Sequence, residues 1–180
     1  IRDVAVTGVQ TCALPISDNA STDATERLCV QLKSEDLRIR YFRHPKNVGP
    51  TANFEFVRQR ATGKYFVWHG DDDCLESRYI ELCVKKLEGD VGLVLAAGLA
   101  AYHCGDSVTT HYGNAMHLTS TSRYARVAQY LWRVQDNSIF CGLYRRATIA
   151  NCMLPNILGG DWAWVRSEEH TSELQSRLHL

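Results

Sequence analysis

The chain has 180 residues with 20 basic and 20 acidic side chains, so its formal net charge is zero. A neutral chain of this kind gives no electrostatic case for binding nucleic acid. No run of about 18 apolar residues occurs, so the sequence predicts no membrane-spanning helix, and the length is that of one domain.

The seven cysteines are spread irregularly through the chain, without a Cys-x-x-Cys pair. This spacing argues against a zinc site. Cysteines scattered through apolar segments favour free thiols in a reducing cytoplasm over a disulfide framework.

Both ends of the chain resemble translated adapter DNA from a sequencing library. With suitable codons, residues 6–16 and residues 166–176 back-translate into two strings that are nearly reverse complements of each other. We therefore expect residues 1–16 and 166–180 to be non-native, so that any helix or strand there is accidental. Residues 17–165 are then an internal fragment of a longer protein. The alternative is that both termini are natural.

Between these ends, the apolar pattern predicts alternating helices and strands. Asp23 is a good N-cap with Glu26 three residues on, which predicts a helix that ends near Ser34. We then expect, in order, a strand over 37–42, a helix from Pro50 to about residue 61, a strand over 65–69, a helix from Ser77 to about residue 87, and a buried strand over 91–99. This alternation is the signature of a parallel sheet with right-handed crossovers.

The second part of the chain is less regular. We expect an edge strand over 107–112, a loop up to residue 122, a short helix over 123–132, a strand over 139–144 and a helix from Arg146 to about residue 152. Gly160-Asp161-Trp162 then opens a further helical segment.

Three consecutive aspartates, Asp71, Asp72 and Asp73, follow the apolar run 65–69. Adjacent carboxylates repel one another, and burying them without partners is costly. We therefore expect them at the carboxyl end of a strand, where ligands bind in an open α/β sheet. Hard oxygen donors on one loop suit Mg²⁺ or Mn²⁺, ions that commonly accompany phosphate. The alternative is a solvated acidic turn.

Four motifs in a fixed order resemble those of family 2 glycosyltransferases with the GT-A fold. They are Ser17-Asp18-Asn19-Ala20-Ser21-Thr22-Asp23, then Asn47-x-Gly49 with Asn53, then Gly63-Lys64-Tyr65 leading to Asp71-Asp72-Asp73, and last Gly142-Leu143-Tyr144-Arg145-Arg146 followed by Gly160-Asp161-Trp162. The resemblance covers essentially all of residues 17–165.

The resemblance implies an α/β protein with an incomplete GT-A (Rossmann-like) fold. Its mostly parallel sheet would be flanked by helices and would lack the first strand. Residues 17–105 would form the nucleotide-sugar-binding half, and residues 106–165 a truncated acceptor-side half. We expect the 180-residue chain to be inactive by itself.

For the intact protein, the resemblance implies metal-dependent, inverting transfer of a sugar from a nucleotide-diphosphate sugar. The donor would be a UDP-sugar, and the acceptor the hydroxyl of a glycan or lipid-linked molecule in polysaccharide biosynthesis. Asp18 would contact the base of the donor nucleotide, and Asn47, Gly49 and Asn53 would line the nucleotide side. By family association the location would be the cytoplasm, including the inner face of the membrane.

The remaining roles concern the metal and the acceptor. Asp71 and Asp73 would hold Mg²⁺ or Mn²⁺, with Asp71 or Asp72 also facing the donor. Asp161 would be the catalytic base on the acceptor hydroxyl. A carboxylate-held cation neutralises a departing diphosphate, and a positioned carboxylate makes a hydroxyl a competent nucleophile.

Structural interpretations compete with several of these roles. Asp23 and Asp161 are also good helix caps, and Asn47 and Gly49 also form loops. Trp68 is either a core residue or a platform for a ligand. Arg145-Arg146 is either a solvated helix start or a phosphate clamp. Two other functions stay open: a sugar nucleotidyltransferase and a nucleotide-binding relative without catalysis.

Overall fold

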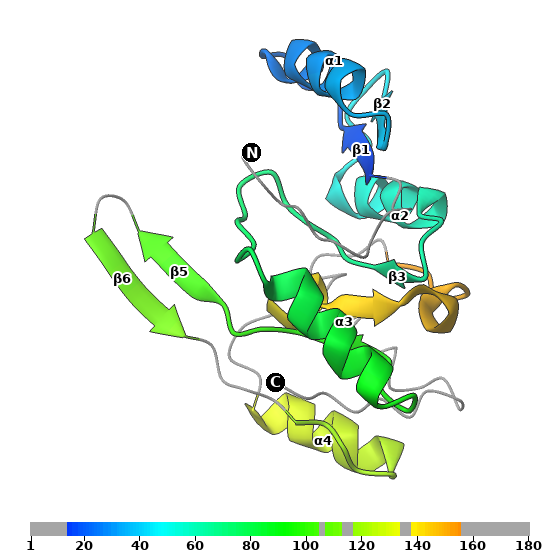
Figure 1. The fold of residues 1–180 in the computed structure, drawn as a ribbon, viewed down its shortest axis with the longest axis vertical. Coiled ribbons are helices and arrows are strands. Elements are labelled where there is room, and N and C mark those ends of the chain that lie inside the picture. The colour runs from blue at the N-terminus through cyan, green and yellow to red at the C-terminus, as the bar shows by residue number, and fades with distance from the viewer. Residues whose placement is uncertain (1–13, 105–106, 113–116, 134–137, 156–180) are drawn as a thin grey trace.

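The computed structural model describes residues 14–104, 107–112, 117–133 and 138–155 (Figure 1). The first unit is a strand-helix-strand crossover at one end of the molecule. Strand β1 (Leu14–Asp18) pairs in parallel with β2 (Ile39–Arg43), and helix α1 (Thr25–Glu35) connects them. Parallel strands joined through a helix are the unit that the alternating pattern predicted.

Strand β1 extends into the stretch expected to be non-native, because residues 14–16 form its first three residues. That expectation allows for an accidental strand there, so it stays a prediction. The Leu14 amide donates to the Arg38 carbonyl at 2.8 Å, and Leu14 lies opposite Ile39 in the register. Pro15 is compatible with this strand because β1 pairs only with β2 among the described residues.

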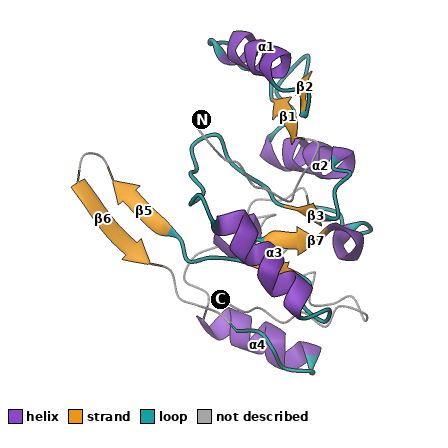
Figure 2. Ribbon diagram, viewed as in Figure 1, coloured by secondary structure: helices purple, strands orange, loops and turns teal. Residues whose placement is uncertain are grey.

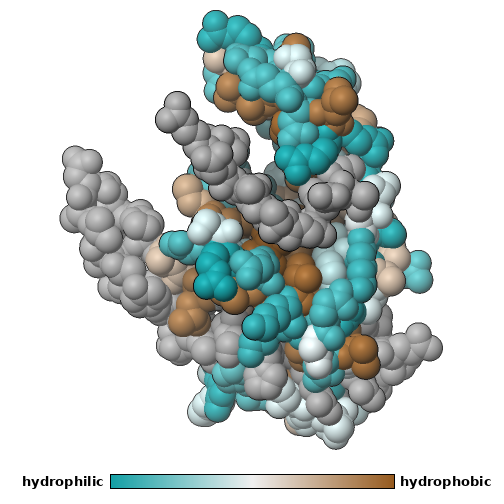
Figure 3. All heavy atoms as spheres, viewed as in Figure 1, coloured by the Kyte–Doolittle hydropathy of each residue, from teal (hydrophilic) through white to brown (hydrophobic). Residues whose placement is uncertain are grey.

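The start of α1 differs from the prediction by one residue. Asp23 Oδ1 accepts hydrogen bonds from the Thr25 amide at 2.9 Å and the Thr25 hydroxyl at 2.6 Å. Asp23 therefore satisfies an amide of the first turn, although Ala24 occupies the N-cap position. Leu28 and Leu37 remain exposed at this end of the molecule, where Figure 3 shows brown atoms among the hydrophilic ones.

Helix α2 (Pro50–Arg60) begins at Pro50, as predicted. Gly49 precedes it with a φ of +85°, a conformation that L side chains rarely adopt, so this position favours glycine. The buried Arg58 pairs with Glu55 at 2.6 Å and donates to the Ile149 carbonyl at 2.8 Å. These bonds fasten α2 to the last part of the chain that the structure describes.

A second sheet lies next to α2 and has the order β3-β7-β4. Strands β3 (Tyr65–Phe66) and β4 (Leu95–Ala96) both pair antiparallel with β7 (Leu143–Arg145). Strands β3 and β4 therefore run in the same direction, as the pattern predicted, but β7 is inserted between them. Helix α3 (Tyr79–Gly89) covers this sheet (Figure 2).

These strands are shorter than the apolar runs that predicted them. Residues 93–97 are all buried, but only Leu95 and Ala96 pair as a strand, and Val91 is 90% exposed. The run 139–144 divides into the 3-10 helix η1 (Ser138–Cys141) and β7. The predicted helix after Arg146 is the short 3-10 helix η2 (Arg146–Ile149). Apolar runs report burial, and burial alone does not fix backbone pairing.

Trp68 is a core residue, as one of its two interpretations held. Its ring stacks on Phe140 with centroids 4.4 Å apart and contacts Phe66 edge-on at 4.7 Å. Its Nε1 donates to the Phe54 carbonyl at 3.1 Å. Trp68 therefore joins the end of β3 to α2 and to the segment before β7.

The two consecutive arginines lie at the start of the 3-10 helix η2, as the first of their two interpretations held, and their side chains are half-buried. Arg145 Nε donates to the Leu93 carbonyl at 2.6 Å, and its terminal nitrogens donate to the carbonyls of Leu87 and Asp90. Arg146 Nε donates to the Gly63 carbonyl at 2.5 Å. Arg145 thus supplies donors to carbonyls at the end of α3, which lack helical partners, and Arg146 supplies one to the turn before β3.

The remaining described elements are a hairpin and a helix. Strands β5 (Ala101–Cys104) and β6 (Ser107–Tyr112) pair antiparallel, which confirms the strand predicted over 107–112. The helix predicted over 123–132 is α4 (Arg123–Arg133). No described helix is long and apolar enough to cross a membrane. Within the described ranges, Cys29, Cys74 and Cys83 are free thiols.

Candidate functional site

Asp18, the last residue of β1, is the buried centre of the candidate site. Its side chain is 0% exposed. Its Oδ1 accepts the Ser21 amide at 2.7 Å, and its Oδ2 accepts the Tyr41 hydroxyl at 2.7 Å. Arg43 Nε lies 3.3 Å from the same Oδ2. The carboxylate is therefore buried with both oxygens engaged, the condition under which a buried charge is tolerated.

The surroundings of Asp18 keep it ionised. Burial by itself would raise the pKa of Asp18, but hydrogen bonds from Ser21 and Tyr41 and the charge of Arg43 outweigh burial and lower the pKa. Burial and the bond to Asp18 raise the pKa of Tyr41. Tyr41 thus remains a neutral phenol that donates its proton to the carboxylate.

A tight turn after β1 directs the Ser21 amide back to Asp18. Ala20 has a φ of +65°, in the left-handed region. That region costs a residue with a side chain roughly 1 kcal/mol or more. The Ser21 amide bond to a buried carboxylate offsets this cost, since hydrogen bonds to charged groups are among the stronger ones in proteins.

Two asparagines join this turn to the loop before α2. Asn19 Nδ2 donates to Asn47 Oδ1 at 3.0 Å, and Asn19 Oδ1 accepts the Val48 amide at 2.8 Å. Asn47 Oδ1 also accepts the Gly49 amide at 2.8 Å. Asn47 is exposed and Asn19 is half-buried, so the amide pair forms a polar surface beside the buried carboxylate.

Asn53 completes the connection from α2. The Ser17 hydroxyl donates to Asn53 Oδ1 at 2.6 Å, and Asn53 Nδ2 donates to the Ser17 carbonyl at 3.2 Å. The structure thus brings together residues that are far apart in the chain and that the family resemblance assigned to the nucleotide side, a role that stays a prediction. They are Asp18, Asn47, Gly49 and Asn53.

The three aspartates lie on the exposed loop between β3 and α3, as predicted. A Cβ added to Gly70 would lie 2.8 Å from Asp72 Oδ1 and 3.0 Å from Asp73 Oδ2. Two carboxylates therefore converge over Gly70, and they belong to Asp72 and Asp73. The pair expected to hold the metal was Asp71 and Asp73, so the role of Asp71 stays a prediction.

The donor set around these carboxylates is incomplete within the described ranges. No group of three His, Cys, Asp or Glu side chains there is arranged to hold a metal ion. Two carboxylates are nevertheless a normal protein contribution to a Mg²⁺ site, where phosphate and water supply the other ligands. Asp72 and Asp73 fit that partial set. Asp161, expected to be the catalytic base, lies outside the described residues.

The sequence analysis predicted only a strand over residues 37–42 and therefore missed the roles of Tyr41 and Arg43. A register argument could have found them. Asp18 lies directly opposite Arg43 in the parallel pair β1–β2, and Ile16 lies opposite Tyr41. Side chains two apart on a strand lie on one face, so Tyr41 and Arg43 both reach the carboxylate.

The fold and the polar loops that follow β1, β2 and β3 define an α/β protein of the GT-A class. A solved structure described as "Crystal structure of S. aureus TarS 1-349" is similar over 92% of this chain and 48% of that chain, with a TM-score of 0.62 and 14% sequence identity. At this identity the likeness shows the fold alone, and it confirms the predicted fold.

The family model for glycosyl transferase family 2 matches residues 10–152, and the chain belongs to this family. The match begins within the stretch 1–16. An uncharacterized glycosyltransferase of Haemophilus influenzae is 27% identical over 157 residues, which are 86% of this chain and 59% of that protein. One from Rickettsia felis is 38% identical over 73 residues, 41% of this chain and 12% of that protein. The matched part of this chain thus covers at most 59% of the length of either relative.

Proposed function

We propose that this chain is part of a glycosyltransferase that moves a sugar from a nucleotide-diphosphate sugar, foremost a UDP-sugar, to an acceptor hydroxyl, and that residues 17–105 bind the donor. The observation that carries the proposal is the ionised, buried Asp18 beside the side-chain amides of Asn19 and Asn47, in a chain of glycosyl transferase family 2. A fixed carboxylate accepts an N–H of a nucleotide base, and neighbouring amides supply both donors and acceptors.

The proposed reaction also needs charge neutralisation and a base. Asp72 and Asp73, with Asp71, would hold Mg²⁺ or Mn²⁺, which when bound stabilises the negative charge of the departing diphosphate. Asp161 would take the proton of the acceptor hydroxyl, on a glycan or lipid-linked molecule, in a single inverting displacement. The convergence of Asp72 and Asp73 over Gly70 supports the metal part of the proposal.

A titration with UDP tests the donor and the metal together. We expect UDP to bind the chain more tightly with Mn²⁺ than without it. Asp73→Asn should reduce that metal-dependent gain by at least about tenfold, since losing even an outer-shell partner of a metal ligand costs about 10–100-fold. Isothermal titration calorimetry measures both quantities.

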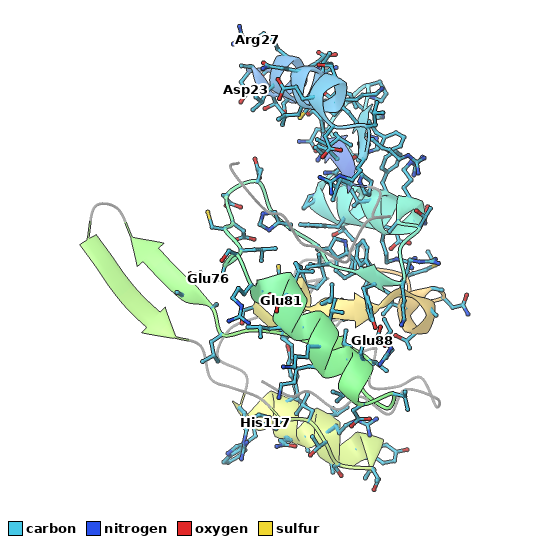
Figure 4. All side chains as sticks on the ribbon, in the orientation of Figure 1. Asp23, Arg27, Glu76, Glu81, Glu88 and His117 are labelled. Carbon is cyan, nitrogen blue, oxygen red and sulfur yellow. The ribbon has the colours of Figure 1, made fainter. Side chains whose placement is uncertain are left out.

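The control for this titration is Glu76→Gln, which removes the same charge from an exposed position of the same loop (Figure 4). It should leave the metal-dependent gain unchanged. UDP binding that is indifferent to Mn²⁺, or equal losses in Asp73→Asn and Glu76→Gln, would contradict a metal site at these aspartates.

A second prediction concerns Gly70. In Gly70→Ala, the new methyl group would meet the carboxylates of Asp72 and Asp73 within 3.0 Å. These side chains are exposed and can swing away, so the free energy of unfolding should change by less than about 0.5 kcal/mol. The displaced carboxylates should bind Mn²⁺ several-fold more weakly, as measured by the paramagnetic broadening of water signals.

Gly89→Ala is the matched control, because a Cβ there meets nothing within 4 Å. It should leave Mn²⁺ binding as it is in the wild type. If Gly70→Ala bound Mn²⁺ with wild-type affinity, the two converging carboxylates would not be metal ligands.

A further inference from the structure

The carboxylate of Asp18 cannot be reached by a ligand in this arrangement. Its side chain is 0% exposed, and it is covered by the Ser21 amide, the Tyr41 hydroxyl and Arg43. A ligand N–H that is to bond with Asp18 must therefore displace one of these three groups. The group whose displacement costs the least free energy is the one a ligand would replace.

Two of the three groups are fixed in place. The Ser21 donor is a backbone amide, held by the turn at Ala20. Tyr41 projects from the middle of β2, is half-buried, and makes a 2.7 Å bond to Asp18. Moving either would disturb the turn or the strand, and would leave a half-buried donor without its acceptor.

Arg43 differs from both. Its side chain is 35% exposed and belongs to the last residue of β2. Its Nε lies 3.3 Å from Asp18 Oδ2 and 3.5 Å from Glu26 Oε2 on α1. A terminal nitrogen also donates to the Ser21 carbonyl at 2.9 Å. Arg43 is therefore shared between a buried carboxylate and an exposed one, and its own charge stays paired if it turns to the exposed one.

We propose that Arg43 is a gate over Asp18, and that Glu26 holds the gate open while a nucleotide base occupies the carboxylate. This inference rests on the proposed function, since it gives Asp18 a base to bind. On binding, a ligand N–H replaces Arg43 at Oδ2, and Arg43 moves fully to Glu26. After the exchange Asp18 accepts the ligand N–H and Glu26 pairs with Arg43, so neither carboxylate is left unpaired.

The gate predicts opposite effects for its two parts. Arg43→Met keeps most of the length of the side chain but removes the guanidinium that covers Asp18. UDP should then bind about threefold to tenfold more tightly, because no binding energy is needed to move Arg43 from Asp18 to Glu26. Glu26→Gln removes the open-state partner, so UDP should bind more weakly by a similar factor. A purely structural ion pair would weaken binding in both variants.

Controls separate the gate from general charge effects. Arg27→Met and Glu35→Gln make the same changes at exposed positions of α1, and Figure 4 shows Arg27 on that helix. Both should bind UDP as the wild type does. All titrations are run at pH 8 so that carboxylates stay ionised in every variant. Equal weakening in Arg43→Met and Glu26→Gln, or no change in either, would overturn the gate.

A second measurement needs no nucleotide. The Nε–Hε signal of Arg43 in NMR relaxation-dispersion experiments should show exchange between two positions in the wild type, and Glu26→Gln should suppress that exchange. If no variant binds UDP but the exchange is present, the proposed function fails and the gate stands. A single Arg43 signal without exchange in the wild type would overturn the gate whatever UDP does.

Discussion

Asp18→Asn should lower the free energy of unfolding by about 3 kcal/mol, because hydrogen bonds to a buried charge contribute about 1.5–3 kcal/mol each. The variant weakens the bonds from Ser21 and Tyr41 and leaves Arg43 facing a neutral amide. We discount the Arg43 part because that side chain is about one-third exposed. Urea denaturation at pH 7 measures the difference.

The comparison variant is Asp72→Asn, an exposed carboxylate on the loop after β3. It should change the unfolding free energy by less than about 0.5 kcal/mol. Equal urea midpoints for Asp18→Asn and wild type would mean that the Asp18 network contributes nothing to stability, and that its burial is incidental.

The same network gives a pH dependence with a defined sign. The fold lowers the pKa of Asp18, so folding favours the ionised carboxylate. The stabilisation is complete above the unfolded pKa of about 3.9 and is lost as the pH falls through the lower, folded value. The difference in stability between wild type and Asp18→Asn should therefore be constant from pH 7 to pH 5 and shrink below about pH 4.

Trp68→Ala should destabilise the protein by about 3–5 kcal/mol, the usual cost of truncating a buried Trp or Phe. Trp68 is 1% exposed and stacks on Phe140. Its loss leaves a large cavity and frees the Phe54 carbonyl. Because Trp68 immediately precedes the loop of the three aspartates, we also expect weaker Mn²⁺ binding. Urea denaturation and a Mn²⁺ titration measure the two effects.

Trp132 provides the matched comparison, since its side chain on α4 is 91% exposed. Trp132→Ala removes the same atoms and should change the unfolding free energy by less than about 0.5 kcal/mol. Similar losses in the two variants would show that the ring cluster around Trp68 does not form the core of the molecule.

The local features of this protein follow from its sequence. Pro50 and the glycine before it set the start of α2, and Asp23 satisfies the first turn of α1. The family resemblance also grouped Asp18, Asn47 and Asn53, and hydrogen bonds join the segments that carry them; their role toward a nucleotide stays a prediction. Caps, turns and periodic apolar faces depend on residues close in the chain, so they can be read from the chain alone.

Only the tertiary structure decided how distant segments combine. The insertion of β7 between β3 and β4 depends on pairing across about 50 to 80 residues of chain, which no local pattern encodes. The partners of Asp18 on β2, the bracing roles of Arg145 and Arg146, and the convergence of Asp72 with Asp73 depend on three-dimensional placement in the same way. Residue types determine which contacts are chemically possible, and the register and packing of the folded chain select among them.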